Sequence, residues 1–156
     1  MHYISGLIAQ SALLTRIAAS LDLLSPTTLP EDLAFLPIDT RDIIRLAGES
    51  RPVLIGDDYQ ALDAAFFPMV QSLSVDGRIA YVQTEYFGGG GGQAALVADQ
   101  GEILFGPTHD KTSGPINDAL RLLGVQGGDD IDPFQAIGLA SHRSNDGWRK
   151  AAGGKA

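Results

Sequence analysis

Hydrophobic and polar positions in the first part of the chain alternate between short apolar runs and helical stripes. Residues 2–10, HYISGLIAQ, form an apolar run around a glycine, which is typical of a short strand. Over 12–23 the apolar positions recur at intervals of three and four, which predicts an amphipathic helix capped by Ser11. The apolar segment 33–38 lies among prolines and indicates an edge strand, because proline cannot donate to a ladder.

Two further helices are predicted before the centre of the chain, with a loop between them. Asp39 or Thr40 can cap a short helix over 41–47. From 59 to 73 an apolar stripe at helical spacing predicts a longer, buried helix. Pro68 falls inside that stripe, so we expect it to kink the helix.

The second half of the chain combines a predicted hairpin with short helices. Segment 78–86 alternates and is rich in aromatic and β-branched residues, which favours a central strand. Segments 93–98 and 102–105 flank the turn Asp-Gln-Gly and predict a hairpin. A helix is expected over 116–123, and Asp132 caps a further short helix before the polar run SHRSNDGW.

These elements predict an α+β fold, with a mainly antiparallel sheet packed against helices. The clearest strands follow one another through short turns rather than crossover helices, which favours antiparallel pairing. A chain of 156 residues fits a single domain, which we assign to residues 1–150. The ending 151–156, AAGGKA, has no apolar periodicity and is expected to be a flexible tail.

Acidic residues outnumber basic ones, which narrows the range of partners. With 11 Lys plus Arg against 19 Asp plus Glu, the formal net charge is −8. Such a field repels nucleic acid and anionic membranes and favours a basic protein partner. Absence of cysteine excludes disulfides and thiolate nucleophiles and fits a cytoplasmic protein. The N-terminal segment lacks a basic leading region, and Arg16 interrupts its apolar pattern, so we expect neither a signal peptide nor a membrane span.

Five consecutive glycines in YFGGGGGQ (86–93) are the main candidate for special backbone chemistry. Gly90, Gly92 and Ala95 match the G-x-G-x-x-A pattern of dinucleotide-binding proteins. That pattern requires a helix after the glycines, and too few residues separate them from the turn at Gly101 to form one. A phosphate-binding loop is excluded because no lysine follows. The run is therefore predicted to join two strands, with contact to a partner as the alternative.

Candidate catalytic residues are few and scattered. His2, His109 and His142 share no metal-binding spacing, and we expect neither a metal site nor a cofactor. Glu85 lies in a predicted strand beside aromatic residues, and a partly buried carboxylate there could act as a general base. An ion pair or an exposed position for this acid is the alternative. No serine lies in a G-x-S-x-G elbow. A small enzyme or ligand-binding protein with a site near Glu85 and His109 is therefore a second hypothesis.

Three segments of the second half resemble a family of small bacterial proteins. They are TEYFGGGGGQAALV (84–97), GPINDALRLLGV (114–125) and DPFQAIGLASHRSNDGW (132–148). The resemblance implies an immunity-type protein, a cytoplasmic antidote that binds and neutralises a toxin delivered between competing bacteria. It supplies no catalytic or binding residue. The glycine run is longer here than the family's turn, so no role transfers to Gly90 or Gly91.

Charge and expected exposure indicate which residues would contact such a toxin. The candidates are four loop acids and one glycine: Asp57, Asp58, Asp129, Asp130 and Gly90. Opposite charge on a basic toxin would speed the encounter and improve selectivity. A third hypothesis is a structural subunit that oligomerises through the edge of the glycine-rich hairpin. The sequence leaves the oligomeric state open.

Overall fold

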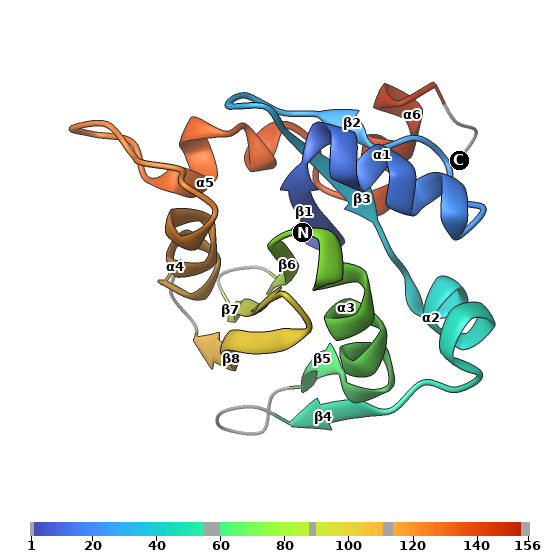
Figure 1. The fold of residues 1–156 in the computed structure, drawn as a ribbon. Coiled ribbons are helices and arrows are strands. Elements are labelled where there is room, and N and C mark those ends of the chain that lie inside the picture. Colours follow the sequence, from blue (N-terminus) through green and yellow to red (C-terminus); the bar gives the residue numbers. More distant parts are fainter. Residues whose placement is uncertain (1, 55–59, 88–89, 111–113, 154–156) are drawn as a thin grey trace.

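An antiparallel sheet of six strands forms the centre of the molecule, in the order β2-β3-β1-β6-β7-β8 (Figure 1). The computed structural model describes residues 2–54, 60–87, 90–110 and 114–153. The strands of this sheet are β1 (His2–Gln10), β2 (Thr27–Thr28), β3 (Leu33–Pro37), β6 (Ile79–Phe87), β7 (Gly90–Asp99) and β8 (Glu102–Asp110). A separate two-stranded sheet pairs β4 (Pro52–Leu54) with β5 (Gln60–Asp63). Neighbouring strands in both sheets run antiparallel, which confirms the predicted α+β fold class.

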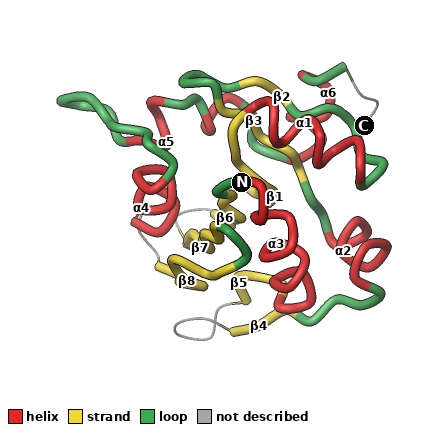
Figure 2. Tube along the Cα trace, in the orientation of Figure 1, coloured by secondary structure: helices red, strands yellow, loops and turns green. Residues whose placement is uncertain are grey.

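Helices cover both faces of the large sheet. They are α1 (Ser11–Ser20), α2 (Thr40–Ala47), α3 (Phe67–Leu73), α4 (Gly114–Leu122), α5 (Pro133–Ala136) and α6 (Asn145–Ala151). Helices α2 and α3 lie on one side of the strands, and α4 and α5 lie on the other (Figure 2). The sheet has a hydrophobic core on each face. Helix α1 contributes Leu14 to one of them, and α6 contributes Trp148 to the other. None of the helices in the described part of the chain has the length and apolarity that crossing a membrane requires.

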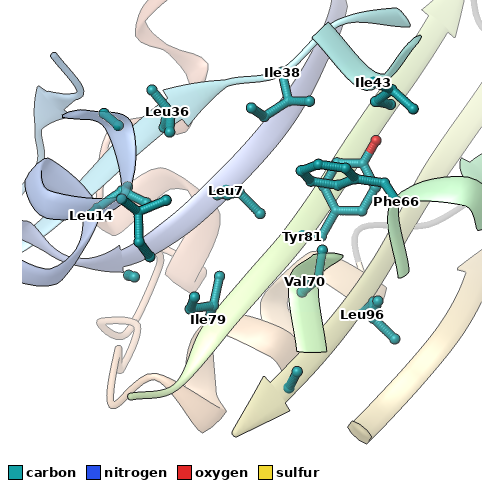
Figure 3. Packing of buried hydrophobic residues seen from close by; sticks show 14 of the residues in the cluster. Leu7, Leu14, Leu36, Ile38, Ile43, Phe66, Val70, Ile79, Tyr81 and Leu96 are labelled. Carbon is teal, nitrogen blue, oxygen red and sulfur yellow. The ribbon is translucent and has the colours of Figure 1, made fainter. Parts of the chain in front are cut away.

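Alternate residues of the same strands supply the two cores. Leu7 and Tyr81 belong to the core shared with α1 and α3, where the ring of Tyr81 meets that of Phe66 at a centroid distance of 5.4 Å (Figure 3). Their chain neighbours Ile8 and Ala80 belong to the core on the opposite face. Successive side chains of a strand point to opposite faces, so strands covered on both sides are apolar at nearly every position.

Strand β3 lies inside the sheet, so the prediction of an edge strand was wrong. All its residues are buried, and it pairs with β1 on one side and β2 on the other. Its proline, Pro37, is the last residue of the strand, opposite Gly6, where a missing amide interrupts little of the ladder. Strand β2 has only two residues, which is too short to produce a periodic signal in the sequence.

The helix predicted over 59–73 starts later than its apolar pattern indicates. Strand β5 occupies its beginning, and a single 3-10 turn over Ala64–Phe66 leads into α3. The carboxylate of Asp63 accepts a hydrogen bond from the amide of Ala65 at 3.0 Å and caps this turn. Pro68 lies in the first turn of α3, where no amide donor is needed, so it begins the helix rather than kinking it. The predicted loop before this segment contains strand β4.

Capping explains where α2 begins but not where α1 begins. The carboxylate of Asp39 accepts from the amide of Asp42 at 3.1 Å, and that of Asp42 accepts from the amide of Asp39 at 3.0 Å. This reciprocal capping box confirms Asp39 as the cap of α2, with Thr40 as its first helical residue. Ser11 is not the cap of α1 but its first residue, and Gln10 before it makes no capping hydrogen bond with its side chain.

Helix α6 was not predicted, because its sequence NDGWRKA contains poor helix formers. Ser144 caps it, accepting a hydrogen bond from the amide of Gly147 at 3.1 Å. The buried ring of Trp148 packs against that of Phe35 at a centroid distance of 5.2 Å. Tertiary packing thus stabilises a helix where local propensity is weak.

Part of the glycine run is strand rather than turn. Gly90, Gly91 and Gly92 pair with the last three residues of β6, while residues 88 and 89 lie outside the described part of the chain. At Gly91, where φ is 111°, a Cβ atom would collide with the carbonyl oxygen of Glu85, so the position requires glycine. Strand β7 continues beyond the glycines, which confirms that no dinucleotide-binding helix follows them.

Candidate functional site

Polar residues replace apolar ones at one end of β1 and β6, on the face shared with α2 and α3. Three cross-strand pairs follow one another there: Leu7 with Tyr81, Ser5 with Gln83, and Tyr3 with Glu85. Alternate residues share a face, so the hydrophobic core gives way to a polar surface within four residues of each strand. This change of character marks the edge of the core nearest the N-terminus of α2.

A cavity of about 140 Å³ lies over these strand ends. We call it the β1–β6 cavity. Its wall consists of Tyr3, Ser5, Ile38, Asp39, Thr40, Ile43, Ser50, Leu62, Asp63, Tyr81, Gln83 and Glu85. Three of these residues are carboxylic acids, and none of them is lysine, arginine or histidine. The cavity therefore presents negative charge together with hydroxyl and amide groups that can donate or accept hydrogen bonds.

Tyr81 lies at the bottom of the β1–β6 cavity with 1% of its surface exposed. Figure 3 shows its hydroxyl pointing toward Ile43, which also lines the cavity. Within the described part of the chain, no group forms a hydrogen bond with this hydroxyl. Burial raises the pKa of Tyr81 far above its ordinary value, and the charges of Asp63 and Tyr3 add to the effect. The hydroxyl stays protonated.

Asp63, the last residue of β5, contributes a carboxylate to the wall of the cavity. Its carboxylate accepts hydrogen bonds from the Ser50 hydroxyl at 2.5 Å, the Arg51 amide at 2.9 Å and the Ala65 amide at 3.0 Å. No lysine, arginine or histidine of the described residues forms an ion pair with it. Neutral donors thus stabilise the Asp63 carboxylate without cancelling its charge.

Asp39 contributes a second carboxylate, and its charge is balanced by Arg149. The guanidinium Nη2 lies 2.9 Å from Asp39 and 3.1 Å from Asp42, with only 15% of the arginine side chain exposed. Burial opposes ionisation of Asp39, but the Asp42 amide and the Arg149 guanidinium outweigh it and lower the pKa of Asp39. Burial raises the pKa of Asp42, reinforced by the neighbouring charge of Asp39. This cluster ties α2 to α6.

Glu85 and Tyr3 form the outer part of the cavity. Burial raises the pKa of the half-buried Glu85 carboxyl group. Tyr3 is 39% exposed, and its pKa is raised by burial and then by the charges of Glu85 and Asp39. Of the two positions considered for Glu85 from the sequence, partly buried or exposed, the structure shows the partly buried one.

His109 lies on the same face of the sheet as Glu85, two strands away. Strand β7 lies between them. Its Gly92 pairs with Glu85, and its Ala94, two residues further along, pairs with His109. A Cβ atom on Gly92 would lie 2.7 Å from the His109 Nε2 atom. Glycine at this position therefore leaves room for the imidazole above β7. His109 does not belong to the wall of the β1–β6 cavity.

The other two histidines lie elsewhere. His2 Nδ1 is 2.6 Å from the Thr84 hydroxyl, on the opposite face of β1 and β6 from Glu85. Its pKa is lowered, mainly by burial. The ring of His142 packs edge-on against Trp148 at 4.7 Å. Among the described residues, no three histidine or acidic side chains are grouped so that they could hold a metal ion.

The acids proposed to contact a partner are only partly within the described chain. Asp129 and Asp130 are exposed on the loop 124–132 between α4 and α5, which we call the acidic loop. This loop projects from the body of the molecule (Figure 1). Asp57 and Asp58 lie outside the described residues.

The acidic loop has an internal structure of its own. The Gly128 amide donates to the Ile131 carbonyl at 2.8 Å, which forms a tight turn around the two acids. Ile131 is 49% exposed beside them, and Arg121 of α4 lines the same open hollow. Gly90, also proposed as a contact, lies instead in β7 opposite Phe87. The structure therefore does not bring Gly90 and the two acids together in one described pocket.

Sequence reasoning missed most of the β1–β6 cavity. Of its wall it singled out Glu85 as a candidate and Asp39 as a helix cap. Tyr3, Ser5 and Tyr81 were part of predicted strands without a proposed role. The available signal was the polar serine and glutamine at positions 5 and 83 of otherwise apolar strands. These two polar residues did not indicate that the segment around Asp63 would form another part of the cavity wall.

Comparison with known proteins gives no match: no family model, no curated protein and no solved structure matches the chain. Fold and site together define an α+β protein with helices on both faces of an antiparallel sheet, an acidic polar cavity and a projecting acidic loop.

Proposed function

We propose that the protein is an immunity-type protein that acts in the cytoplasm, where it binds a basic protein toxin and neutralises it by occlusion. The observation that carries the proposal is the acidic loop, which exposes Asp129, Asp130 and the apolar Ile131 beyond the body of the molecule. The net charge of −8 and the resemblance of three segments to a family of candidate immunity proteins support it. The proposal requires no cofactor.

The base of the acidic loop is fixed while its tip is exposed. Asn117 of α4 is buried and connects this helix to the α5 end of the loop. Its Nδ2 donates to the Asp132 carboxylate at 3.1 Å, and its Oδ1 accepts from the Phe134 amide at 2.9 Å. Since these bonds tie the α5 end of the loop to α4, less conformational entropy is lost when its tip binds a partner. Such pre-organisation favours recognition by a projecting loop.

Charge and shape indicate how the loop would contact a toxin. Carboxylates at a projecting tip attract a basic surface at long range, which accelerates association and favours the correct partner. Ile131 beside them offers apolar area that becomes buried in the complex. A stable interface buries about 800 Å² on each partner, more than one loop provides. Asp57, Asp58 and Gly90 remain proposed as further contacts.

Capture of the partner and rescue of growth test this function together. The tagged protein would be recovered from lysate of its native host at moderate salt, and stoichiometric partners would be identified by mass spectrometry. We expect a basic protein whose expression stops growth unless this protein is expressed with it. A captured protein that is harmless on its own would contradict the immunity function.

A second candidate function is a small-molecule site or enzyme active site at Glu85 and His109. It is favoured by one observation: Gly92 leaves space for the His109 ring on the face that carries Glu85. A carboxylate and an imidazole on one face are the groups that general acid–base chemistry uses. Substrate screening with E85Q and H109Q variants tests it. The hypothesis fails if every activity found survives both substitutions.

A further inference from the structure

We infer that the β1–β6 cavity is a binding site for an alkylammonium group, supplied by a free primary amine or by a lysine side chain of a partner. The site is separate from the acidic loop and does not depend on the proposed immunity function. Charge, an unused polar group at its bottom, and size each support the assignment.

The charge of the cavity favours a cation. Asp39, Asp63 and Glu85 line it, and none of the described residues of its wall is lysine, arginine or histidine. Arg149 balances Asp39 from outside the cavity. The hydrogen-bond partners of Asp63 are a hydroxyl and two amides, which leave its negative charge in place. A cation in the cavity would interact favourably with these charges at short range.

The hydroxyl of Tyr81 is the second, independent observation. It belongs to a side chain that is 1% exposed, lines the cavity, and forms no hydrogen bond with any described residue. The hydroxyl meets the open space of the cavity while the rest of the side chain is buried, so it is available to a ligand atom that can complete its hydrogen bonding. Because its pKa is raised, the hydroxyl is neutral and can accept a hydrogen bond from an N–H donor.

The size and walls of the cavity specify the rest of the ligand. A volume of about 140 Å³ is small, so it fits an ammonium head with a short alkyl stem. Drug-sized and nucleotide ligands need pockets of about 300 Å³ or more. Ile38, Ile43 and Leu62 supply apolar wall for the methylene groups. An ammonium ion has three donors and no acceptor, which suits a wall that carries three carboxylates.

The test titrates the full-length protein with three small probes. n-Butylammonium represents a free amine, and lysine blocked at its amino and carboxyl ends represents a partner's side chain. n-Butanol has a similar size without the charge. Binding is followed by NMR chemical shifts of β1, β6 and α2 amides. We expect saturable shifts with one or both amines, at least tenfold tighter binding than with n-butanol, and the tighter amine identifies the source.

Two variants with matched controls locate the binding. Y81F removes only the buried hydroxyl, and E85Q removes a charge at the half-exposed rim. Each is expected to weaken amine binding about tenfold, the range for a hydrogen bond to a charged group. Y86F, on the opposite face of β6, and E102Q, on the exposed strand β8, should leave binding unchanged.

Three results would overturn the assignment. They are no saturable shift with either amine, equal affinity for n-butanol, or full amine binding in both Y81F and E85Q. Failure of toxin capture would leave the assignment intact, because these titrations use no protein partner. If the amines do not bind but a toxin does, the cavity is not the recognition site, and the immunity proposal stands on the acidic loop alone.

Discussion

At the scale of single residues, Gly92 and Tyr81 show how one atom decides what the site can contain. Gly92 has no Cβ, and the space that a Cβ would occupy is bounded by the ring of His109 and the carbonyl of Asp110. Tyr81 differs from phenylalanine by a single hydroxyl group, which lies in the β1–β6 cavity. Small substitutions at these positions therefore test the structure at its most sensitive points.

Gly92→Ala is expected to destabilise the protein by about 1–3 kcal/mol, because the added methyl overlaps its surroundings. A Cβ there would lie 2.5 Å from the Asp110 carbonyl oxygen and 2.7 Å from His109 Nε2. Gly128→Ala is the control, since a Cβ at Gly128 meets no atom within 4 Å. Urea denaturation measures both. Equal stability of the two variants would show that β7 and β8 are less closely packed than described.

Because the Tyr81 hydroxyl is buried, the free energy of unfolding should depend on pH in the alkaline range. Its pKa is raised in the folded protein, so above the ordinary pKa of 10.0 only the unfolded chain releases this proton. The stabilisation that the protonated Tyr81 hydroxyl gives the folded state is fully present below pH 10 and is lost as the pH rises further. We expect the free energy of unfolding to fall more steeply between pH 9.5 and 11 in wild type than in Y81F. Parallel pH profiles of the two proteins would contradict the buried position.

At the scale of elements, α6 and β5 show what the sequence could not predict. The local patterns of α2 and β6 agree with the final structure, so both were predicted correctly. Helix α6 has weak local propensity and forms where Trp148 docks onto the sheet. Strand β5 carries apolar spacing that continues into α3, and only the capping role of Asp63 separates the two elements. Docking onto the sheet decided the first case, and a side-chain cap decided the second.

The same limit applied to the candidate site. Glu85 was singled out as a candidate general base because its own strand placed it among aromatic residues. The other carboxylates of the β1–β6 cavity reach it from the N-cap of α2 and from the end of β5, which no short-range pattern connects with β6. A cavity made by segments far apart in the chain has no periodic signature.

Trp148→Ala tests whether docking holds α6 in place. The substitution removes a buried ring packed against Phe35 and His142, and truncation of a core tryptophan costs about 3–5 kcal/mol. Lys150→Ala, at an exposed position of the same helix, should change stability by less than about 0.5 kcal/mol. Thermal denaturation followed by circular dichroism compares the two. A loss below about 1 kcal/mol for the tryptophan variant would show that α6 is not anchored by this ring.

At the scale of the whole molecule, net charge and shape act together. The chain carries a formal charge of −8, and the acidic loop extends part of that charge away from the sheet and helices. A basic partner would be attracted over a distance set by the Debye length, about 8 Å at physiological salt. Toxin association is therefore expected to slow as salt concentration rises, while association that is independent of salt would exclude electrostatic steering.

The most direct test of the central claim is a protection assay with the acidic loop reversed in charge. Cells that express the captured toxin would receive wild type, the D129K/D130K double variant, or D76K, which changes an exposed acid of the turn after α3. We predict that wild type and D76K restore growth and that the double variant, folded but binding the toxin at least tenfold more weakly, does not. Full protection by the double variant would contradict the role of the acidic loop in neutralising a toxin.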